Sequence, residues 1–219
     1  MEKIFITGSG SIVGTNICTD GKCGFNPQDF PDFTGFIKAA YKHFKIGFPK
    51  FYKMDNLSKL AFLTSEILLR DRKLTERYKP EETGIVLLNS SSTLETDDKH
   101  YHSIRDRSNY FPSPAVFVYT LPNIMIGEIS IRNRIMGENV VFISEEYKPE
   151  ILYEYVTFLM TNGHVNACIA GWVEYGRSGK DYESVMYLVE KVDFTNLNIK
   201  FETSYLEKHY CDLKAKHYG

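Results

Sequence analysis

The feature that most constrains the fold is a strand–turn–helix pattern in the second half of the chain. Residues 136–147 read MGENVVFISEEY, and the apolar run VVFI within them predicts a buried strand. An almost wholly apolar helix is predicted to follow from Pro149. Several folds present a catalytic nucleophile on such a turn between a strand and a helix. Here the turn offers Ser144, Glu145 and Glu146, and it contains no cysteine.

Alternating helix and strand patterns extend over the rest of the chain. The continuous apolar run GIVLL at 84–88 is typical of a parallel strand that is buried on both faces. The predicted helices cover 33–43, 55–68, 122–135 and 149–162, and the predicted strands cover 4–6, 84–88, 139–144, 165–174 and 184–192. This order predicts an α/β fold with a mixed, mostly parallel sheet, an antiparallel edge and one domain over residues 1–219.

Turn and loop residues separate these elements. The Gly-Ser run at 8–11 is predicted to be a turn, residues 16–34 a loop, and residues 90–107 a polar loop in which a helix from Asp97 is the alternative. The run at 8–11 also permits a dinucleotide-binding interpretation. Its spacing departs from G-x-G-x-x-G, however, and no helix follows at once. A simple glycine turn is the preferred interpretation.

The composition excludes several functions. A net charge of −2 gives no overall attraction to nucleic acid or to an anionic membrane surface. No run approaches the ~20 apolar residues that a membrane span needs, and the N-terminus lacks the features of a signal peptide. A cytoplasmic location and no cofactor are therefore expected. In a reducing compartment the cysteines are expected to be free thiols (Cys18, Cys23, Cys168 and Cys211).

Three groups of residues could react or bind a metal, and each has a simpler interpretation. Cys18 and Cys23 have no nearby histidine, which disfavours a metal site there. His100 and His102 could chelate a metal on a strand face, but their charged neighbours favour a solvated loop. Cys168 lies in an apolar strand, where a buried thiol is a poor nucleophile. No metal site is therefore predicted.

The turn at 144–146 permits three interpretations. Ser144 could act as a nucleophile, although no G-x-S-x-G motif surrounds it. Glu145 and Glu146 could form a carboxylate pair for acid–base catalysis. Alternatively, both carboxylates lie in the first turn of the following helix, where the helix dipole stabilises negative charge by roughly 0.3–1 kcal/mol. Physical reasoning from these residues favours the last interpretation.

A basic stretch precedes the helix predicted from Asp55 or Asn56. Its lysines are interleaved with aromatic residues (Lys42, Lys45, Lys50 and Lys53). Such a stretch could dock an acidic partner. A solvated surface is the competing interpretation.

Several short segments, taken in order, resemble one enzyme family. They are KIFITGSG at 3–10, MDNLSKLA at 54–61, ETGIVL at 82–87, PSP at 112–114, TLPN at 120–123, GEISI at 127–131, GEN at 137–139 and AGWVE at 170–174. Over residues 3–192 the chain resembles the N-terminal half of β-ketoacyl synthases of the thiolase superfamily, and most closely their chain-length-factor-like members. The resemblance implies half of a thiolase-like fold with a buried central helix.

The main departure from the family lies at the position of its catalytic cysteine. Counting from Gly137, Glu146 occupies that position, or Glu145 if the gap shifts by one. A carboxylate cannot accept an acyl group from a carrier thioester as a thiolate does, because the resulting mixed anhydride would hydrolyse. The family's two catalytic histidines belong to a C-terminal half, and this sequence ends at Gly219. Independent condensation activity is therefore not expected.

The resemblance implies a non-catalytic subunit that forms a heterodimer with an active ketosynthase in polyketide or fatty-acid biosynthesis, as in aryl-polyene or flexirubin-type pigment pathways. An acyl carrier protein is the further expected partner, with the four lysines named above as contact candidates. The candidates for a shared acyl tunnel or the subunit interface are Phe117, Tyr119, Thr120, Pro122, Asn123 and Met125. The alternatives are a stand-alone acyl hydrolase or transferase that uses Ser144 or Glu146, and a structural homodimer.

Overall fold

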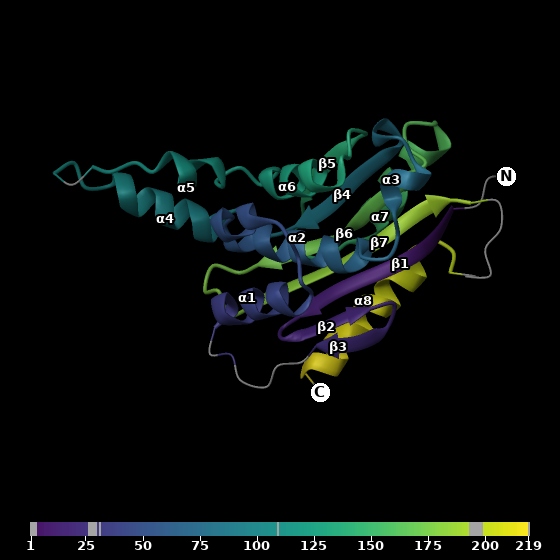
Figure 1. Cartoon of the computed structure of the whole chain (residues 1–219), viewed down its shortest axis with the longest axis horizontal. Coiled ribbons are helices and arrows are strands. Elements are labelled where there is room, and N and C mark those ends of the chain that lie inside the picture. The colour runs from purple at the N-terminus through teal and green to yellow at the C-terminus, as the bar shows by residue number, and fades with distance from the viewer. Residues whose placement is uncertain (1–3, 26–29, 31, 109, 193–198, 219) are drawn as a thin grey trace.

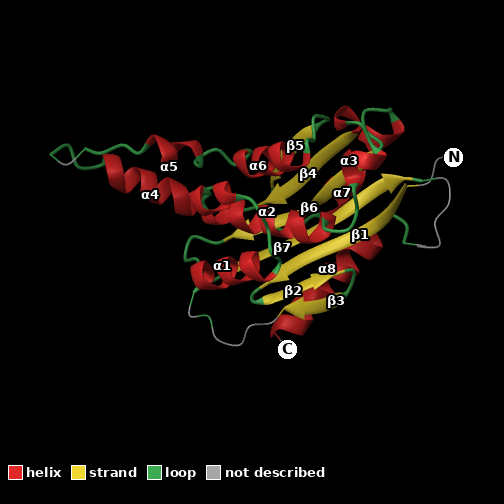
Figure 2. Ribbon diagram, in the orientation of Figure 1, coloured by secondary structure: helices red, strands yellow, loops and turns green. Residues whose placement is uncertain are grey.

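A seven-stranded sheet with helices on both faces organises the chain (Figure 1, Figure 2). The structure is a computed structural model that describes residues 4–25, 30, 32–108, 110–192 and 199–218. The strands, in the spatial order β3-β2-β1-β7-β6-β4-β5, are β1 (Ile4–Val13), β2 (Asn16–Thr19), β3 (Lys22–Phe25), β4 (Thr83–Asn89), β5 (Asn139–Ile143), β6 (Ala167–Tyr175) and β7 (Tyr182–Lys191). The helices are α1 (Phe33–His43), η1 (Pro49–Lys53), α2 (Asn56–Leu69), α3 (Leu74–Arg77), η2 (Pro80–Glu82), α4 (Leu94–Ile104), α5 (Pro114–Val118), α6 (Ile124–Asn133), α7 (Pro149–Thr161) and α8 (Thr203–Tyr218).

Parallel pairing is confined to one side of the sheet. β4 pairs in parallel with β5 and β6, whereas β6–β7, β7–β1, β1–β2 and β2–β3 are antiparallel. Residues 176–181 join β6 to β7, and this link is too short for the crossover that parallel neighbours need. The predicted mixed α/β sheet is confirmed. The prediction that it is mostly parallel is wrong.

β1 passes without interruption through residues 8–11, which the sequence predicts to be a turn. The glycines there allow α2 to pack closely on the sheet. A Cβ on Gly10 would lie 3.1 Å from Leu68 Cβ and 3.2 Å from the Thr64 carbonyl oxygen. The prediction of a glycine turn is therefore wrong. A dinucleotide site needs a turn followed by a helix N-terminus at this place, so that interpretation fails as well.

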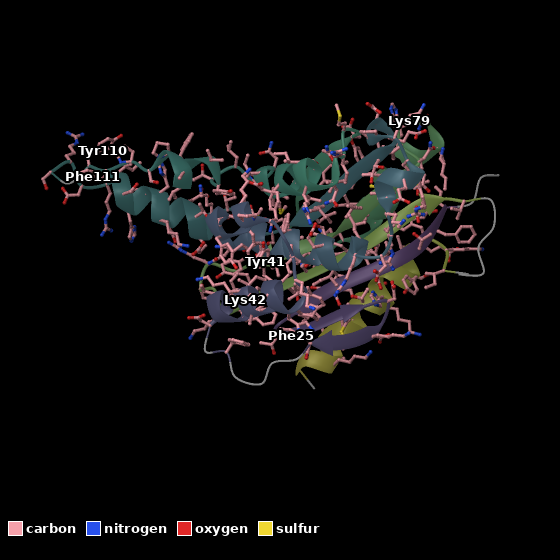
Figure 3. All side chains as sticks on the ribbon, viewed as in Figure 1. Phe25, Tyr41, Lys42, Lys79, Tyr110 and Phe111 are labelled. Atoms are coloured by element: carbon pink, nitrogen blue, oxygen red, sulfur yellow. A yellow bond between two sulfur atoms is a disulfide. The ribbon has the colours of Figure 1, made fainter. Side chains whose placement is uncertain are left out.

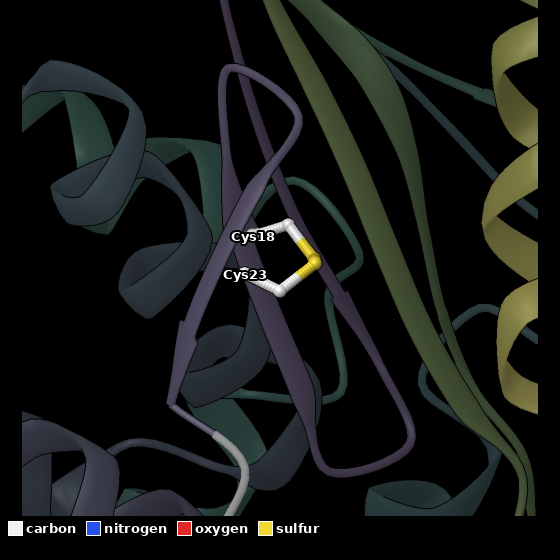
Figure 4. The surroundings of a disulfide bond; sticks show 2 residues. All are labelled: Cys18 and Cys23. Carbon is white, nitrogen blue, oxygen red and sulfur yellow. A yellow bond between two sulfur atoms is a disulfide. The ribbon is translucent and has the colours of Figure 1, made fainter.

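A disulfide-linked hairpin forms the sheet edge beyond β1. β2 and β3 are joined by Asp20 and Gly21, whose φ angles of 49° and 75° suit the tight turn that Asp-Gly pairs favour. Cys18 and Cys23 face each other across this hairpin and form a disulfide (Figure 4). The loop prediction is therefore wrong for residues 16–25, and the prediction of free thiols is wrong for these two cysteines. Because both sulfurs are in the disulfide, neither is available to a metal.

The opposite edge of the sheet is β5, and it is only half-buried. Ile143, its last residue, is 56% exposed. The sequence predicts a buried strand here, because four apolar residues follow one another. That prediction is wrong, since β5 has a neighbouring strand on one side only among the described residues. β5 therefore presents unpaired backbone groups along its outer side.

α1, α2 and α6 cover one face of the sheet, and their predicted ranges are confirmed to within two residues. α2 starts at its N-cap Asp55, whose carboxylate accepts a hydrogen bond of 3.0 Å from the Ser58 amide. Four consecutive side chains of α2 are fully buried (Leu60, Ala61, Phe62 and Leu63). A helix that is apolar on all sides must be covered in this way. α2 is therefore the buried helix of this fold.

α7 and α8 lie on the other face. The sequence predicts α7 to be buried on nearly every side, but Tyr153 and Phe158 on this helix are exposed, and Phe158 is 52% exposed. Only one side of α7 packs against the sheet, so the prediction is wrong in this respect. α8 docks on the same face through Leu206 and Leu213. No helix in the described part of the chain, α7 included, is long and apolar enough to cross a membrane.

α4 and α5 form an arm that projects away from the sheet (Figure 1). We define this α4–α5 arm as residues 94–108 and 110–121, with Tyr110 and Phe111 at its tip (Figure 3). The prediction of a polar loop is wrong for 94–104, which form α4. An ion pair between Glu95 and Lys99, four residues apart, stabilises this helix.

Candidate functional site

The turn at 144–146 lies where the carboxyl ends of three parallel strands meet. β4, β5 and β6 end at Asn89, Ile143 and Tyr175. Ligand and catalytic sites of parallel sheets form at this edge. The Ser144 amide donates a hydrogen bond of 2.9 Å to the Asn89 carbonyl, which ties the turn to the end of β4. The predicted order of strand, turn and helix is thus confirmed, with α7 following at Pro149.

A carboxylate from β6 organises the loop beside this turn. Glu174 Oε2 accepts hydrogen bonds from the Ser90 amide at 2.8 Å, the Ser91 amide at 3.1 Å and Asn89 Nδ2 at 3.1 Å. Asn89 is fully buried and also donates to the Val173 carbonyl at 2.6 Å. Hydrogen bonds to an ionised group are stronger than neutral ones, so Glu174 holds the loop at 90–91 in one conformation.

Sequence reasoning did not identify Glu174 or Asn89 as site residues. Their mutual hydrogen bond links positions 85 residues apart, and no local spacing reveals such a contact. The available signal was chemical. Each is a polar residue at the end of an otherwise apolar strand, on the edge where strand ends converge.

The turn has the hydrogen bonding of an ordinary connection. Ser144 Oγ donates to the Glu146 carbonyl at 2.8 Å, and Ser90 Oγ donates to the Glu145 carbonyl at 3.1 Å. None of Ser144, Glu145 and Glu146 has the positive φ that marks a strained turn. Because the Ser144 hydroxyl donates to backbone within its own turn, no described histidine takes its proton. This arrangement does not activate a nucleophile.

The two glutamates of the turn do not lie in the first turn of a helix. α7 begins at Pro149 with Lys148 as its N-cap, and the acidic residue of its first turn is Glu150. The prediction that Glu145 and Glu146 form the helix N-terminus is therefore wrong. Both side chains are exposed to solvent at the carboxyl edge of the sheet. They form neither a buried base nor a helix cap.

A second polar group forms where the arm joins the body. The Tyr119 hydroxyl donates to Glu128 Oε1 at 2.9 Å, and Lys50 Nζ pairs with Glu128 Oε2 at 2.8 Å. Glu128 is almost fully buried on α6. Burial and this carboxylate raise the pKa of the Tyr119 phenol, so it stays a hydrogen-bond donor. Glu128, which sequence reasoning missed, thus joins a tunnel candidate to a carrier-contact candidate.

The six tunnel and interface candidates do not share one lining surface. Tyr119 and Met125 are buried, whereas Phe117 and Asn123 are exposed. Thr120 and Pro122 are half-buried. The Thr120 carbonyl accepts a hydrogen bond of 2.9 Å from Thr93 Oγ1, which closes the base of the arm.

His100 belongs to the arm, where its ring packs against Phe117 of α5, and it does not chelate a metal together with His102. The His100 ring lies 5.3 Å from the Phe117 ring. Both histidines are in α4, where residues two apart point to different sides of the helix. The predicted solvated loop is therefore a helix.

All four candidate lysines are exposed, but their aromatic neighbours belong partly to the core. The Tyr41 ring stacks on Phe51 at 4.3 Å, and Phe51 is fully buried. Lys42 lies in the last turn of α1, whereas Lys50 and Lys53 belong to η1. The lysines therefore lie on a rigid surface, and their contact with a carrier protein stays a prediction.

The two remaining cysteines are free, as predicted. Cys168 is fully buried in β6, and burial raises the pKa of its thiol. A thiol in this state is a poor nucleophile. Cys168 is a core residue and has no part in the site at 144–146.

Comparisons with known proteins identify the fold. No protein-family model matches the chain, and no curated protein matches it. Solved structures do. The ishigamide ketosynthase/chain length factor matches with a TM-score of 0.62 and 17% identity, over 90% of this chain and 64% of that chain. A type II polyketide synthase acyl-carrier protein in complex with its hexaketide-bound ketosynthase matches at 0.61 and 14% identity, over 87% and 63%. A ketosynthase in complex with its chain length factor from Xenorhabdus doucetiae matches at 0.55 and 16% identity, over 87% and 79%.

These matches show that the chain has a ketosynthase-like and chain-length-factor-like fold. The predicted resemblance and the half thiolase-like architecture are thereby confirmed at the level of fold. The chain spans slightly less than two thirds of the length of the first two structures.

Proposed function

We propose that this chain is a non-catalytic, chain-length-factor-like subunit that forms a heterodimer with an active β-ketoacyl synthase. The observation that carries the proposal is the turn at 144–146. In a ketosynthase-like fold, an exposed glutamate stands where the resemblance puts the nucleophilic cysteine, and the turn is relaxed. An acyl group transferred to the Glu146 carboxylate would form a mixed anhydride, which water hydrolyses. The chain therefore depends on a partner that keeps the cysteine.

The proposed partners follow from the proteins that this fold resembles. Two of the similar structures are described as a ketosynthase with its chain length factor and as an acyl-carrier protein with its ketosynthase. By this proposal, Tyr119 and Met125 line an acyl tunnel shared with the ketosynthase, and Phe117, Thr120, Pro122 and Asn123 lie at the interface. The exposed lysines at 42, 45, 50 and 53 face the acidic carrier protein. The product is a polyketide or fatty-acid chain of the polyene type.

We further propose that the complex works in the cytoplasm, as a single-domain subunit without a cofactor. The Cys18–Cys23 disulfide is the observation that opposes a reducing compartment. Alkylation of free thiols in fresh cell extract separates the two cases. Labelling of both cysteines supports the cytoplasm, and protection of both contradicts it.

The decisive experiment is co-expression with a ketosynthase encoded beside this protein, followed by mass measurement of the purified complex. The expected result is a one-to-one complex that contains this 25.3 kDa chain. The complex should condense acyl and malonyl carrier proteins, whereas this chain alone should not. A monomer or homodimer that ignores every such ketosynthase would overturn the proposal.

A pair of variants tests the turn itself. Glu146→Ala and its neighbour Glu145→Ala should leave condensation by the complex within about twofold of the wild type, because neither carboxylate is an acyl acceptor. Acyl hydrolysis by the isolated chain that disappears in Glu146→Ala but not in Glu145→Ala would establish a stand-alone enzyme instead.

A further inference from the structure

A cavity of about 320 Å³ lies at the C-terminal ends of α2 and α6, which pack against each other. Arg70 at the end of α2, Arg132 in the last turn of α6 and Arg134 directly after α6 line it, and we call it the three-arginine cavity. Glu66 is the only carboxylate among the described residues that line it, so three positive charges stand against one negative charge. The volume is at the lower end of the range for small-molecule sites, roughly 300–1,000 Å³. Size and charge therefore suit a small anion.

Neighbouring side chains hold two of these arginines in place. The guanidinium carbon of Arg70 lies 5.6 Å from the centre of the Phe44 ring, and that of Arg132 lies 5.5 Å from the centre of the Phe48 ring. Glu66 accepts hydrogen bonds from Arg132 Nε at 3.0 Å and from Nη2 at 2.9 Å, which leaves Nη1 outside this fork. Side chains that are already held lose little conformational freedom when a ligand binds. The cavity is thus prepared for a ligand.

Arg134 has a backbone conformation that favours glycine. Its φ of 55° and ψ of 44° lie in the left-handed region, and its amide donates to the Ser130 carbonyl, which ends α6. Glycine is the usual residue at a helix end of this kind, because the cap needs only the backbone. Arg132 already supplies the positive charge that a helix C-terminus favours. The Arg134 side chain therefore needs another explanation, and a residue in a strained conformation is a reason to look for a function.

Two of the arginines have donors to spare. Neither Arg70 nor Arg134 forms an ion pair with a carboxylate in the described part of the chain, although both side chains are exposed. Thr75, from α3, adds a hydroxyl group to the lining of the cavity. A guanidinium group presents a planar set of N–H donors that matches the oxygens of a phosphate group, and it keeps its charge at every physiological pH. This donor set favours a phosphate group as the ligand.

We propose that the three-arginine cavity binds the phosphate group of a small molecule, either inorganic phosphate or a phosphate monoester. This inference is separate from the proposed function, because the cavity and the turn at 144–146 lie at opposite edges of the sheet. The Met136 amide donates to the Pro80 carbonyl at 2.8 Å, so the chain directly after Arg134 reaches the amino end of β4, whereas the turn lies at the carboxyl end. A long polyanion such as nucleic acid is disfavoured, since the whole chain has a net charge of −2.

The test is isothermal titration of the purified full-length chain, near neutral pH and at low ionic strength. The probes are inorganic phosphate, methyl phosphate and the dicarboxylate succinate. Arg134→Gly should raise the Kd of the phosphate probes about tenfold or more, because it removes a charged donor. Lys73→Gly is the matched control and should change the Kd less than about twofold. Lys73 is also exposed and has a φ of 37°, but it lies outside the cavity lining. Glycine suits a positive φ, so neither variant should lower the melting temperature.

The two phosphate probes distinguish the source of the ligand. Tighter binding of inorganic phosphate indicates the free ion, and tighter binding of methyl phosphate indicates a monoester. Either result supports the phosphate site.

Three results would overturn the proposal. The first is that the wild type binds neither phosphate probe. The second is an equal loss of affinity in Arg134→Gly and Lys73→Gly, which would show a general effect of charge. The third is that succinate binds as tightly as the phosphate probes, since the cavity would then accept any dianion. If Arg134→Gly does not fold, Arg70→Gln gives the answer, because it removes a second charged donor of the cavity and should raise the Kd by a similar factor.

Discussion

One face of the sheet packs against α2 through apolar side chains, whereas on the other face α8 adds a cluster of polar and ionisable groups to its apolar contacts at Leu206 and Leu213. On the first face, the ring of Phe62 in α2 stacks on Phe48 at 5.0 Å and is fully buried. On the second, Glu183 of β7 accepts a hydrogen bond of 2.9 Å from Trp172 Nε1 and pairs with Lys214 of α8 at 3.1 Å. The Tyr210 hydroxyl of α8 donates to the same carboxylate.

This difference indicates which part of the molecule has a stability that depends on solution conditions. Apolar burial changes little with pH or salt, so the α2 face should stay formed wherever the protein is folded. A buried carboxylate is stable only while its partners are present. α8 should therefore open at a lower free energy than α2, as a local event.

The largest expected effect comes from a cavity in the apolar face. Phe62→Ala should lower the free energy of unfolding by about 3–5 kcal/mol, since a fully buried ring is removed and its neighbours cannot fill the space. Denaturant titration followed by circular dichroism measures the loss. Phe158→Ala, at a half-exposed ring of α7, is the control and should cost less than about 1 kcal/mol. Equal losses in the two variants would mean that the faces do not differ.

A smaller and more local effect is expected on the polar face. Glu183→Ala leaves Trp172, Tyr210 and Lys214 without their shared acceptor, which should cost about 2–3 kcal/mol because Lys214 is partly hydrated. Hydrogen exchange should accelerate in residues 203–218 and stay unchanged in α2. The exposed Glu207 on α8 provides the control, and Glu207→Ala should behave as the wild type. Equal acceleration in α2 would show that the two faces open together.

The disulfide-linked hairpin at the sheet edge allows a test of whether a change at the edge also affects the helix packed on the face. Reduction of the Cys18–Cys23 disulfide should lower the free energy of unfolding by about 2 kcal/mol, as expected for a short closed loop. Asp20 in this hairpin bonds to the Ser9 amide at 2.9 Å and helps to line a cavity of about 310 Å³ with Tyr205 and His209 of α8. Exchange in α8 should nevertheless stay unchanged on reduction. Faster exchange there would couple the edge to the polar face.

The smallest effect is a pH dependence of α8. His209 Nδ1 lies 3.0 Å from the Tyr187 hydroxyl, and burial lowers the pKa of this histidine below its usual 6.5. Nearby Asp212 and Lys216 act on it in opposite directions. The unfolded state takes up the proton first as pH falls, so stability is constant above about pH 6.5 and decreases below it.

Hydrogen exchange of the α8 amides, corrected for the intrinsic exchange rate, should therefore be faster at pH 5.5 than at pH 7.5, relative to that of α2. His209→Gln should remove this difference. A wild-type α8 whose protection is the same at both pH values would contradict the assignment.

Local patterns predicted the elements whose cause is local. α1 follows from its apolar spacing, α2 from apolar spacing together with a cap at Asp55, and β4 from its apolar run. The sequence predicts only residues 4–6 of β1, because the glycines that follow resemble a turn. In the structure these glycines allow α2 to pack closely on the strand. The hairpin was missed although its Asp-Gly pair was a local signal.

The residues of the candidate site also differ in whether local sequence predicts them. The turn at 144–146 was found, since a strand and a helix bracket it in sequence. Glu174 and Glu128 were not, because Glu174 acts on residues about 84 positions away and Glu128 pairs with Lys50 from a distant segment. The exposure of α7 could not be predicted either. An apolar composition predicts that a helix is buried, but it does not predict which side of the helix packs against the rest of the protein.

The hydrogen bond between Thr93 and the Thr120 carbonyl has a consequence for the speed of association. It closes the two ends of the arm, so the arm loses little conformational freedom when a partner arrives. A disordered segment would bind with an ordering penalty, and its complexes would separate more readily. A partner that contacts the pre-formed arm should instead associate at an ordinary docking rate, about 10⁵–10⁷ M⁻¹s⁻¹.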